Sequence, residues 1–196
     1  MDKTKYPELT EAIEMLQSWD RNTDVNSVPT TLFGSFIKTI WDDRHYGDYE
    51  FITGVTPLTE DQTVDYLKRA QAFMLKNFGT IRVPWGEVHK LRRGDKSLSI
   101  ESFADLLSPS YPKANIINGK LEFNPEHGDT YCMFVKYGKD GAEKIETLEP
   151  LGNSLNPTSK HYTDQMEIFT KKQHKQMPFN KEYWLTHAET TYHPKR

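Results

Sequence analysis

The first 80 residues place apolar side chains three and four positions apart, which is the repeat of a helix that buries one face. The clearest stripe comprises Phe33, Phe36, Ile37, Ile40 and Trp41. Because a half-buried strand would instead alternate every second residue, this repeat restricts the chain to folds that begin with packed helices.

The starts and ends of three helices can be read from the same region. Ser27 and Pro29 suit the start of the helix that carries the stripe, and Thr59 and Gln62 have the spacing of a capping box that opens another helix, ending at Gly79. That helix is expected to point Val64, Leu67, Ala70, Phe73, Met74 and Phe78 inward. An earlier helix is expected to align Leu9, Ile13, Leu16 and Trp19 on one face, with Pro7 in its first turn.

The pattern changes at Ile81. Pro84, Gly86 and Gly94 interrupt a mixed aromatic and basic segment, and a stretch rich in Ser, Pro and Asn continues to Pro125, so extended and loop structure is expected there. Trp85 is interpreted as a packed anchor, and the neighbouring arginines as partners of carboxylates. The alternative, that this segment binds a nucleic acid, is disfavoured because the chain is acidic overall.

The last third is expected to form a β-hairpin and short closing helices. Tyr131–Tyr137 and Lys144–Leu148 read as strands, and Gly138–Gly141 as the turn between them. Two closing helices are predicted, His161–His174 with Tyr162, Met166 and Phe169 inward, and Asn180–Ala188 with Tyr183 and Trp184 inward. The fold class is therefore α+β, in a single segment 1–196 with a helical part (1–80), an extended and loop part (81–127) and a hairpin part (128–196).

Composition limits the partners of the chain. Hydrophobic residues make up 36% and aromatic residues 12% of the sequence, which indicates a folded piece with partly polar surfaces that is open to completion by another chain. The formal net charge of −3 comes from charges spread along the chain, so neither nucleic acid nor membrane is an expected partner. No run of about 18 apolar residues and no export signal is visible.

Catalytic and metal motifs of the common classes are absent from the sequence, and no cofactor is expected. A single cysteine, Cys132, excludes a multi-cysteine zinc site, and the seven histidines are scattered. His127 with Asp129 comes closest to a ligand cluster, but a metal needs three or four converging ligands, so none is expected. Asp129 precedes a strand that looks buried, where its carboxylate could be aimed at a neighbour or could simply cap the strand. Ser159 is a natural N-cap, which would place Asp164 in the first turns of the following helix.

Four segments resemble, in order, the C-terminal region of the β chain of penicillin-amidase-type acylases, the N-terminal-nucleophile hydrolases that include penicillin, cephalosporin, aculeacin and acyl-homoserine-lactone acylases. They are LQSWDRNTDVNSVPTTLF (Leu16–Phe33), WGEVHKLRRG (Trp85–Gly94), GDTYCMFVKYG (Gly128–Gly138) and LGNSLNPTSKHYTDQ (Leu151–Gln165) ahead of MPFNKE. The sequence departs from the family pattern at Gly152–Leu155, where the family has Gly-Gln-Ser-Gly.

The resemblance implies an αββα fold to which this chain adds helices and a hairpin, and hydrolysis of an N-acyl amide through an acyl-serine. The family nucleophile is a serine at the free N-terminus of the β chain, whereas this chain starts with Met1 and Asp2, so the chain alone is expected to be inactive. The implied partners are the N-terminal part of the β chain, the α chain and a small N-acyl substrate, in the periplasm of a bacterium or outside the cell.

The resemblance maps Asp129 onto a carboxylate that orients a histidine near the nucleophile. A different class of function stays open: a stand-alone binding or assembly module that holds a partner through its aromatic surface and has no enzymatic activity.

Overall fold

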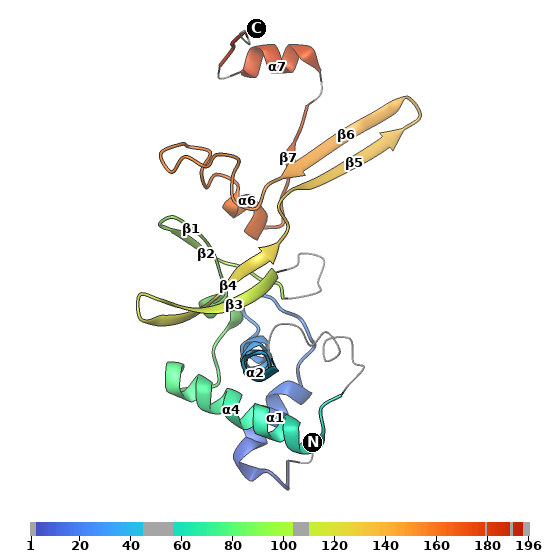
Figure 1. Cartoon of the computed structure of the whole chain (residues 1–196). Helices are drawn as coiled ribbons and strands as arrows, with labels where there is room; N and C mark the ends of the chain where they lie inside the picture. The colour runs from blue at the N-terminus through green and yellow to red at the C-terminus, as the bar shows by residue number, and fades with distance from the viewer. Residues whose placement is uncertain (1–2, 45–56, 104–109, 179, 189, 194–196) are drawn as a thin grey trace. The chain divides into compact units, whose positions relative to one another are not determined.

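The computed structural model describes residues 3–44, 57–103, 110–178, 180–188 and 190–193 (Figure 1). The fold is α+β, with helices first and small antiparallel sheets after them. The chain divides into two compact units, Met1–Gly128 and Asp129–Arg196.

The helices at the start of the first unit are largely those that the sequence predicts. The 3-10 helix η1 (Pro7–Leu9) leads into α1 (Thr10–Gln17), and α2 spans Val28–Arg44. Leu9 and Ile13 are buried as predicted, whereas Trp19 lies beyond the end of α1. The side chain of Trp19 instead turns back, and its Nε1–H donates to the carbonyl of Asn22 at 2.8 Å.

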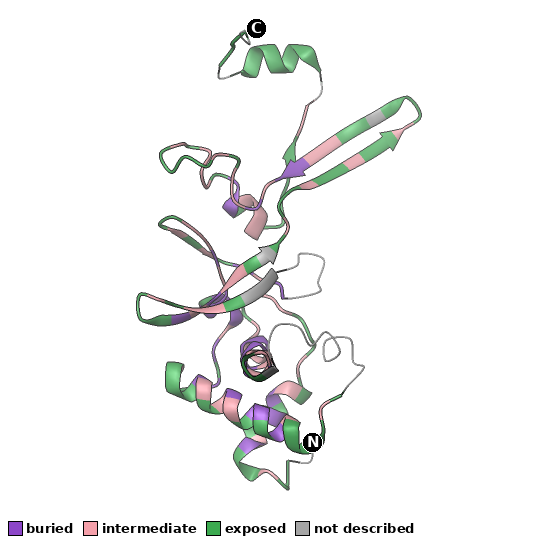
Figure 2. Ribbon diagram, viewed as in Figure 1, coloured by how far each residue is buried: buried purple, intermediate pink, exposed green. Residues whose placement is uncertain are grey.

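Helix α2 buries more than the predicted stripe. Figure 2 shows purple segments along it, and the side chains with the lowest exposure are Thr30, Thr31, Leu32, Ser35, Thr39 and Ile40. Phe33, Phe36 and Ile37 are partly buried and pack against the edge of the core. The reason is that α2 has helical neighbours on several sides, since it contacts α1, α4 and α5. A helix so enclosed needs small polar side chains where its neighbours approach closely.

Helix α4 (Glu60–Phe78) begins and ends where the sequence predicts. The Thr59 hydroxyl accepts the Gln62 N–H at 3.2 Å, and the Gln62 side chain accepts the Thr59 N–H at 3.0 Å, which completes the capping box. Gly79 ends the helix in a left-handed conformation with φ +71°. Val64, Leu67, Ala70 and Met74 are buried; Phe73 and Phe78 are only partly so.

The segment after α4 contains more strand than expected. A short helix, α5 (Trp85–Val88), precedes the hairpin of β1 (Lys90–Arg93) and β2 (Lys96–Ser99). A second hairpin pairs β3 (Ser110–Ile117) with β4 (Lys120–Gly128). The extended structure expected as far as Pro125 is thus organised into two paired hairpins, which the sequence analysis did not predict. Asn118 and Gly119, with φ of 52° and 76°, form the tight turn, and Asn-Gly between two segments that carry apolar residues is a strong hairpin signal that the prediction overlooked.

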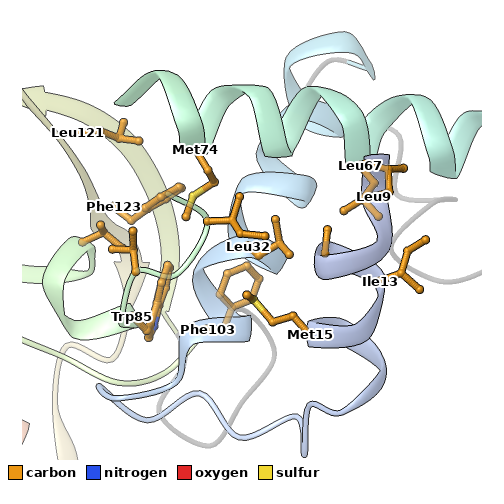
Figure 3. Close-up of a cluster of buried hydrophobic side chains, with 14 of the residues drawn as sticks. Leu9, Ile13, Met15, Leu32, Leu67, Met74, Trp85, Phe103, Leu121 and Phe123 are labelled. Carbon is orange, nitrogen blue, oxygen red and sulfur yellow. The ribbon is translucent and has the colours of Figure 1, made fainter. Parts of the chain in front are cut away.

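The core of the first unit joins the helices to these hairpins. Figure 3 shows Leu9, Ile13 and Leu67 from the helices at one end of the cluster, and Trp85, Leu121 and Phe123 at the other. Trp85 is completely buried, so its interpretation as a packed anchor is confirmed. Its indole Nε1–H donates to the carbonyl of Ser102 at 2.9 Å, which satisfies the one polar atom of the ring.

The irregular segment between α1 and α2, residues 18–27, forms a strap that is fixed to α5 by backbone hydrogen bonds. The Trp85 N–H donates to the Ser27 carbonyl at 3.0 Å, and the Gly86 N–H donates to the Val25 carbonyl at 2.7 Å. Two of the family-like segments, Leu16–Phe33 and Trp85–Gly94, are thus held against each other.

The second unit contains the predicted hairpin, formed by β5 (Cys132–Gly138) and β6 (Gly141–Leu148), with β7 (Lys175–Gln176) beside β6. The expectation that the first of these strands is buried is wrong. Tyr131, Met133, Phe134 and Tyr137 are each more than half exposed.

The predicted helix His161–His174 is much shorter in the structure, as α6 (Met166–Thr170). Its start is delayed because polar side chains before it bond to nearby backbone: the Ser159 hydroxyl accepts the His161 N–H at 3.1 Å, which favours turns over a helix. It ends in a Schellman motif around Lys172, whose φ is 54°, with the Gln173 N–H donating to the Ile168 carbonyl at 2.9 Å. Met166 is buried as predicted.

The closing helix α7 (Lys181–His187) has Asn180 as its N-cap, close to the predicted start. Tyr183 and Trp184, expected to point inward, are 36% and 50% exposed, so that prediction is wrong. The Tyr183 ring contacts Trp184 and His187 of the same helix, and no residue of α7 is buried.

Replacing Gly86 by Ala should lower the free energy of unfolding by about 1–3 kcal/mol, the usual range for overpacking. The added methyl group would lie 2.6 Å from Val25 Cβ and 3.0 Å from the Val25 carbonyl oxygen. Thermal or denaturant unfolding of the chain measures the loss.

Gly79→Ala provides the matched control, because nothing lies within 4 Å of the new methyl group and only the left-handed φ of +71° opposes it. Val25→Gly should recover part of the loss in the Gly86 variant and none in the Gly79 variant. If Val25→Gly changes the free energy of unfolding by the same amount in both glycine variants, the close approach of the strap to α5 is contradicted.

Candidate functional site

Asp129, the residue that the sequence singles out, lies between β4 and β5 and is partly buried. Its carboxylate is close to the thiol of Cys132. Burial raises the pKa of the Cys132 thiol, and the negative charge of Asp129 and its hydrogen bond with the thiol raise that pKa further. The thiol therefore stays protonated at neutral pH and donates to the carboxylate, so Cys132 is held as a poor nucleophile.

The structure does not bring a histidine to Asp129 among the side chains that it describes; the partner that it gives is Cys132. The side chain of His127, which the sequence places closest to Asp129 among the histidines, lies outside the described part of the chain. Within the described residues, no three His, Cys, Asp or Glu side chains gather into a possible metal site.

A histidine and a carboxylate do meet elsewhere in the second unit. His161 Nδ1 lies 2.8 Å from Asp164 Oδ2, and both side chains are more than a third exposed. Asp164 was expected in the first turns of a helix, but α6 begins at Met166, so Asp164 lies before the helix and orients the imidazole instead. The sequence signal for this pair was the i, i+3 spacing of the two residues.

This pair belongs to a closed loop, Leu151–Gln165, the fourth family-like segment. Its ends meet where the Gln165 N–H donates to the Leu151 carbonyl at 3.3 Å, and the buried Gln165 side chain accepts the Glu149 N–H at 2.9 Å. Gly152 is needed inside the loop because its φ is 149° and a Cβ there would lie 2.5 Å from the His161 carbonyl oxygen. Gln165 could not be singled out from the sequence, since a glutamine before a helix carries no distinctive signal.

The titratable groups of the first unit near Trp85 are structural. His89 is fully buried, stacks on the Trp85 ring at 4.5 Å and donates from Nδ1 to the Ile100 carbonyl at 2.9 Å. A carbonyl can only accept, so this bond requires the tautomer with its proton on Nδ1. Burial lowers the pKa of His89 to about 4, against a small opposing effect of the Ile100 carbonyl.

The basic segment on β1 makes the predicted contact with a carboxylate. Arg92 Nε and Nη2 donate to the two oxygens of Glu122 on β4, at 3.1 and 2.6 Å. Burial opposes ionisation of Glu122, but its hydrogen bonds with Arg92 and Asn124 outweigh this and hold its pKa below the usual range. This confirms a carboxylate as the partner of Arg92, as the sequence analysis favoured.

The penicillin amidase family model matches residues 2–184 of the chain. The chain belongs to the penicillin amidase family. A solved structure, the thermostable penicillin G acylase from Alcaligenes faecalis in orthorhombic form, is similar to this chain at 13% sequence identity and a TM-score of 0.43. The alignment covers 96% of the present chain and 42% of that acylase chain, so this family member spans less than half of that acylase's length. Among its described residues, no helix has the length and apolar character to cross a membrane.

The buried His89 should make this family member less stable in mild acid. Its folded pKa is about 4 and the unfolded value about 6.5, so the unfolded state binds more protons between these pH values. The stability contributed by neutral His89 is therefore complete above pH ~6.5 and falls as the pH drops towards ~4, by up to about 3 kcal/mol.

Urea unfolding as a function of pH measures this effect. His89→Asn keeps a donor that can reach the Ile100 carbonyl but cannot titrate, so its stability should decline less steeply over the same pH range. Parallel pH profiles of the two proteins would show that His89 is not the source of the acid sensitivity.

Proposed function

We propose that the chain is the C-terminal part of the catalytic polypeptide of an N-acyl amide hydrolase. The observation that carries the proposal is the family match over residues 2–184, which includes both units of the chain. The serine nucleophile and its α-amino base would lie in sequence that precedes this segment in the complete enzyme. The chain would then contribute structure, and the hairpin β5–β6 would add strands to one sheet of an αββα fold.

The exposed apolar side chains of the second unit support an incomplete fold. Large apolar residues are at least half exposed on and just before the hairpin, in the loop Leu151–Gln165 and in the closing segment, at Tyr131, Met133, Phe134, Tyr137, Leu155, Trp184, Leu185 and Tyr192. Such a concentration on one small unit is typical of a surface that another polypeptide covers. The partners proposed are the N-terminal part of the β chain and the α chain, with a small N-acyl molecule as substrate.

The complete enzyme is proposed to act in the periplasm or outside the cell, as its family resemblance implies. Fractionation of the source cells, followed by detection of the chain with an antibody, would test this. Recovery in the cytoplasm alone would contradict it.

The isolated chain is expected to hydrolyse no amide. Chromogenic acyl-anilides and N-acyl amino acids are the substrates to use, first with the chain alone and then after addition of the remaining acylase polypeptide. Turnover should appear only in the mixture. Activity that copurifies with the chain alone would refute the proposal, and stable folding without any association would favour a stand-alone module.

Asp129 is proposed to orient a histidine near the nucleophile once the enzyme is complete. Its partly buried carboxylate, at the start of β5, could fix the tautomer of an imidazole supplied by the preceding sequence. Two simpler roles compete with this one: a cap at the start of the strand, and the acceptor for the Cys132 thiol.

Asp129→Asn in the complete enzyme should lower kcat by about a hundredfold or more if the residue orients a catalytic base, with the fold intact. Cys132→Ala is the matched control, because it removes the thiol that Asp129 accepts from and leaves the carboxylate in place. Steady-state kinetics and thermal melts should be done on the same preparations. An unchanged kcat with stability lowered by roughly 0.5–2 kcal/mol would instead assign Asp129 a capping role.

A further inference from the structure

The turn of the hairpin β3–β4 carries the one Asn-Gly pair of the sequence, Asn118 and Gly119. The ladder pairs Ile117 with Lys120, so these two residues make up the whole loop between the strands (Figure 1). Both are exposed, and a Cβ built on Gly119 would meet nothing within 4 Å. The turn is therefore open to solvent and leaves room for the Asn118 side chain to move.

Two groups in this turn can react with each other. They are the side-chain amide of Asn118 and the backbone N–H of Gly119, and neither makes a hydrogen bond with any residue that the structure describes. A bond from the Gly119 nitrogen to Cγ of Asn118 would close a five-membered ring. Because glycine has no side chain, nothing on residue 119 hinders the approach of its nitrogen.

We propose that Asn118 is a site of spontaneous deamidation, at which water converts the asparagine of the turn into aspartate or isoaspartate. The Gly119 nitrogen gives its proton to solvent base and attacks Asn118 Cγ, and the side-chain nitrogen leaves as ammonia. The cyclic imide then adds one water. Opening at the Cγ carbonyl gives aspartate, and opening at the backbone carbonyl gives isoaspartate, in which the main chain runs through the former side chain. The sum is one amide and one water converted to one carboxylic acid and one ammonia.

The other two asparagines of the same hairpin lack these features. Asn115 precedes Ile116, whose branched Cβ crowds the attacking nitrogen, and Asn124 precedes Pro125, whose nitrogen has no proton to lose. Both also lie within the ladder, and the Asn115 side chain donates to the Asn124 side chain at 3.2 Å. The hairpin thus contains its own unreactive comparison sites.

The two products should affect the hairpin differently. Asp-Gly suits a two-residue hairpin loop as well as Asn-Gly does, so aspartate should keep the turn. Isoaspartate adds a methylene group to the backbone, and a loop fitted to two residues then no longer closes the pair Ile117–Lys120. Leu121 and Phe123 of β4 follow directly and are buried in the core of the first unit. Isoaspartate at residue 118 should therefore destabilise that unit.

Peptide mapping by mass spectrometry tests the chemistry. The purified chain is kept at physiological temperature and mildly alkaline pH, because hydroxide helps to remove the Gly119 proton. The tryptic peptide Ala114–Lys120 should gain the mass difference between an amide and an acid and separate into two isomers. Fragment ions should locate the acid at Asn118, while Asn115 and Asn124 stay amides. An isoaspartyl methyltransferase should label one of the two isomers.

Urea unfolding of samples taken during the incubation tests the structural effect. The unfolding midpoint of the unmodified chain should fall as isoaspartate accumulates. Asn118→Gly is the matched control, because Gly-Gly suits the same loop and has no side-chain amide, so its midpoint should stay constant. Asn118→Asp, measured fresh, should match the fresh unmodified chain, because it adds the charge without lengthening the backbone.

Three outcomes would overturn the proposal. Asn118 could keep its amide throughout, or another asparagine of the chain could be converted faster. The midpoint of Asn118→Gly could fall as quickly as that of the unmodified chain, which would place the damage elsewhere. Fresh Asn118→Asp could be as unstable as the aged chain, which would assign the effect to charge and not to isoaspartate. Because none of these readouts uses catalysis, failure here would leave the proposed acylase function untouched.

Discussion

The burial of the Trp85 indole holds the first unit together. The ring packs within 6 Å of His89, Phe103 and Phe123, and its N–H is satisfied by the Ser102 carbonyl. The backbone N–H of the same residue holds the strap before α2. One residue thus links helices, strap and β4. Its polar atoms must all find partners, because a buried indole N–H or amide without one costs about 1–3 kcal/mol.

Features of the fold set by neighbouring residues could be predicted from the sequence. The capping box of Thr59 with Gln62 and the ending at Gly79 depend on contacts within one helical turn, and both are present. The hairpin turn at Gly138–Gly141 is equally local. The Asn118-Gly119 turn had a signal of the same quality, so the strands on either side of it could have been predicted.

Burial was predicted less well, because it depends on what packs against a segment. The pattern of apolar residues in β5 and α7 predicts that they face inward, yet Tyr137 and Trp184 are exposed. Such a pattern shows that a side chain suits burial, but it does not show which polypeptide would bury it. The same limit applies to the site. Asp129 could be proposed from its position before a strand, whereas its contact with Cys132 and the pairing of His161 with Asp164 needed three-dimensional geometry.

The loop Leu151–Gln165 makes several hydrogen bonds within itself. Besides the closure by Gln165, the Ser154 N–H donates to the His161 carbonyl and the Asn156 side chain accepts the Thr158 N–H. A loop ordered in this way has already lost its conformational entropy before any partner arrives. Its tip carries Leu155, which is 90% exposed. A polypeptide that docks there would meet a preorganised surface, and its affinity would not be reduced by the cost of ordering the loop.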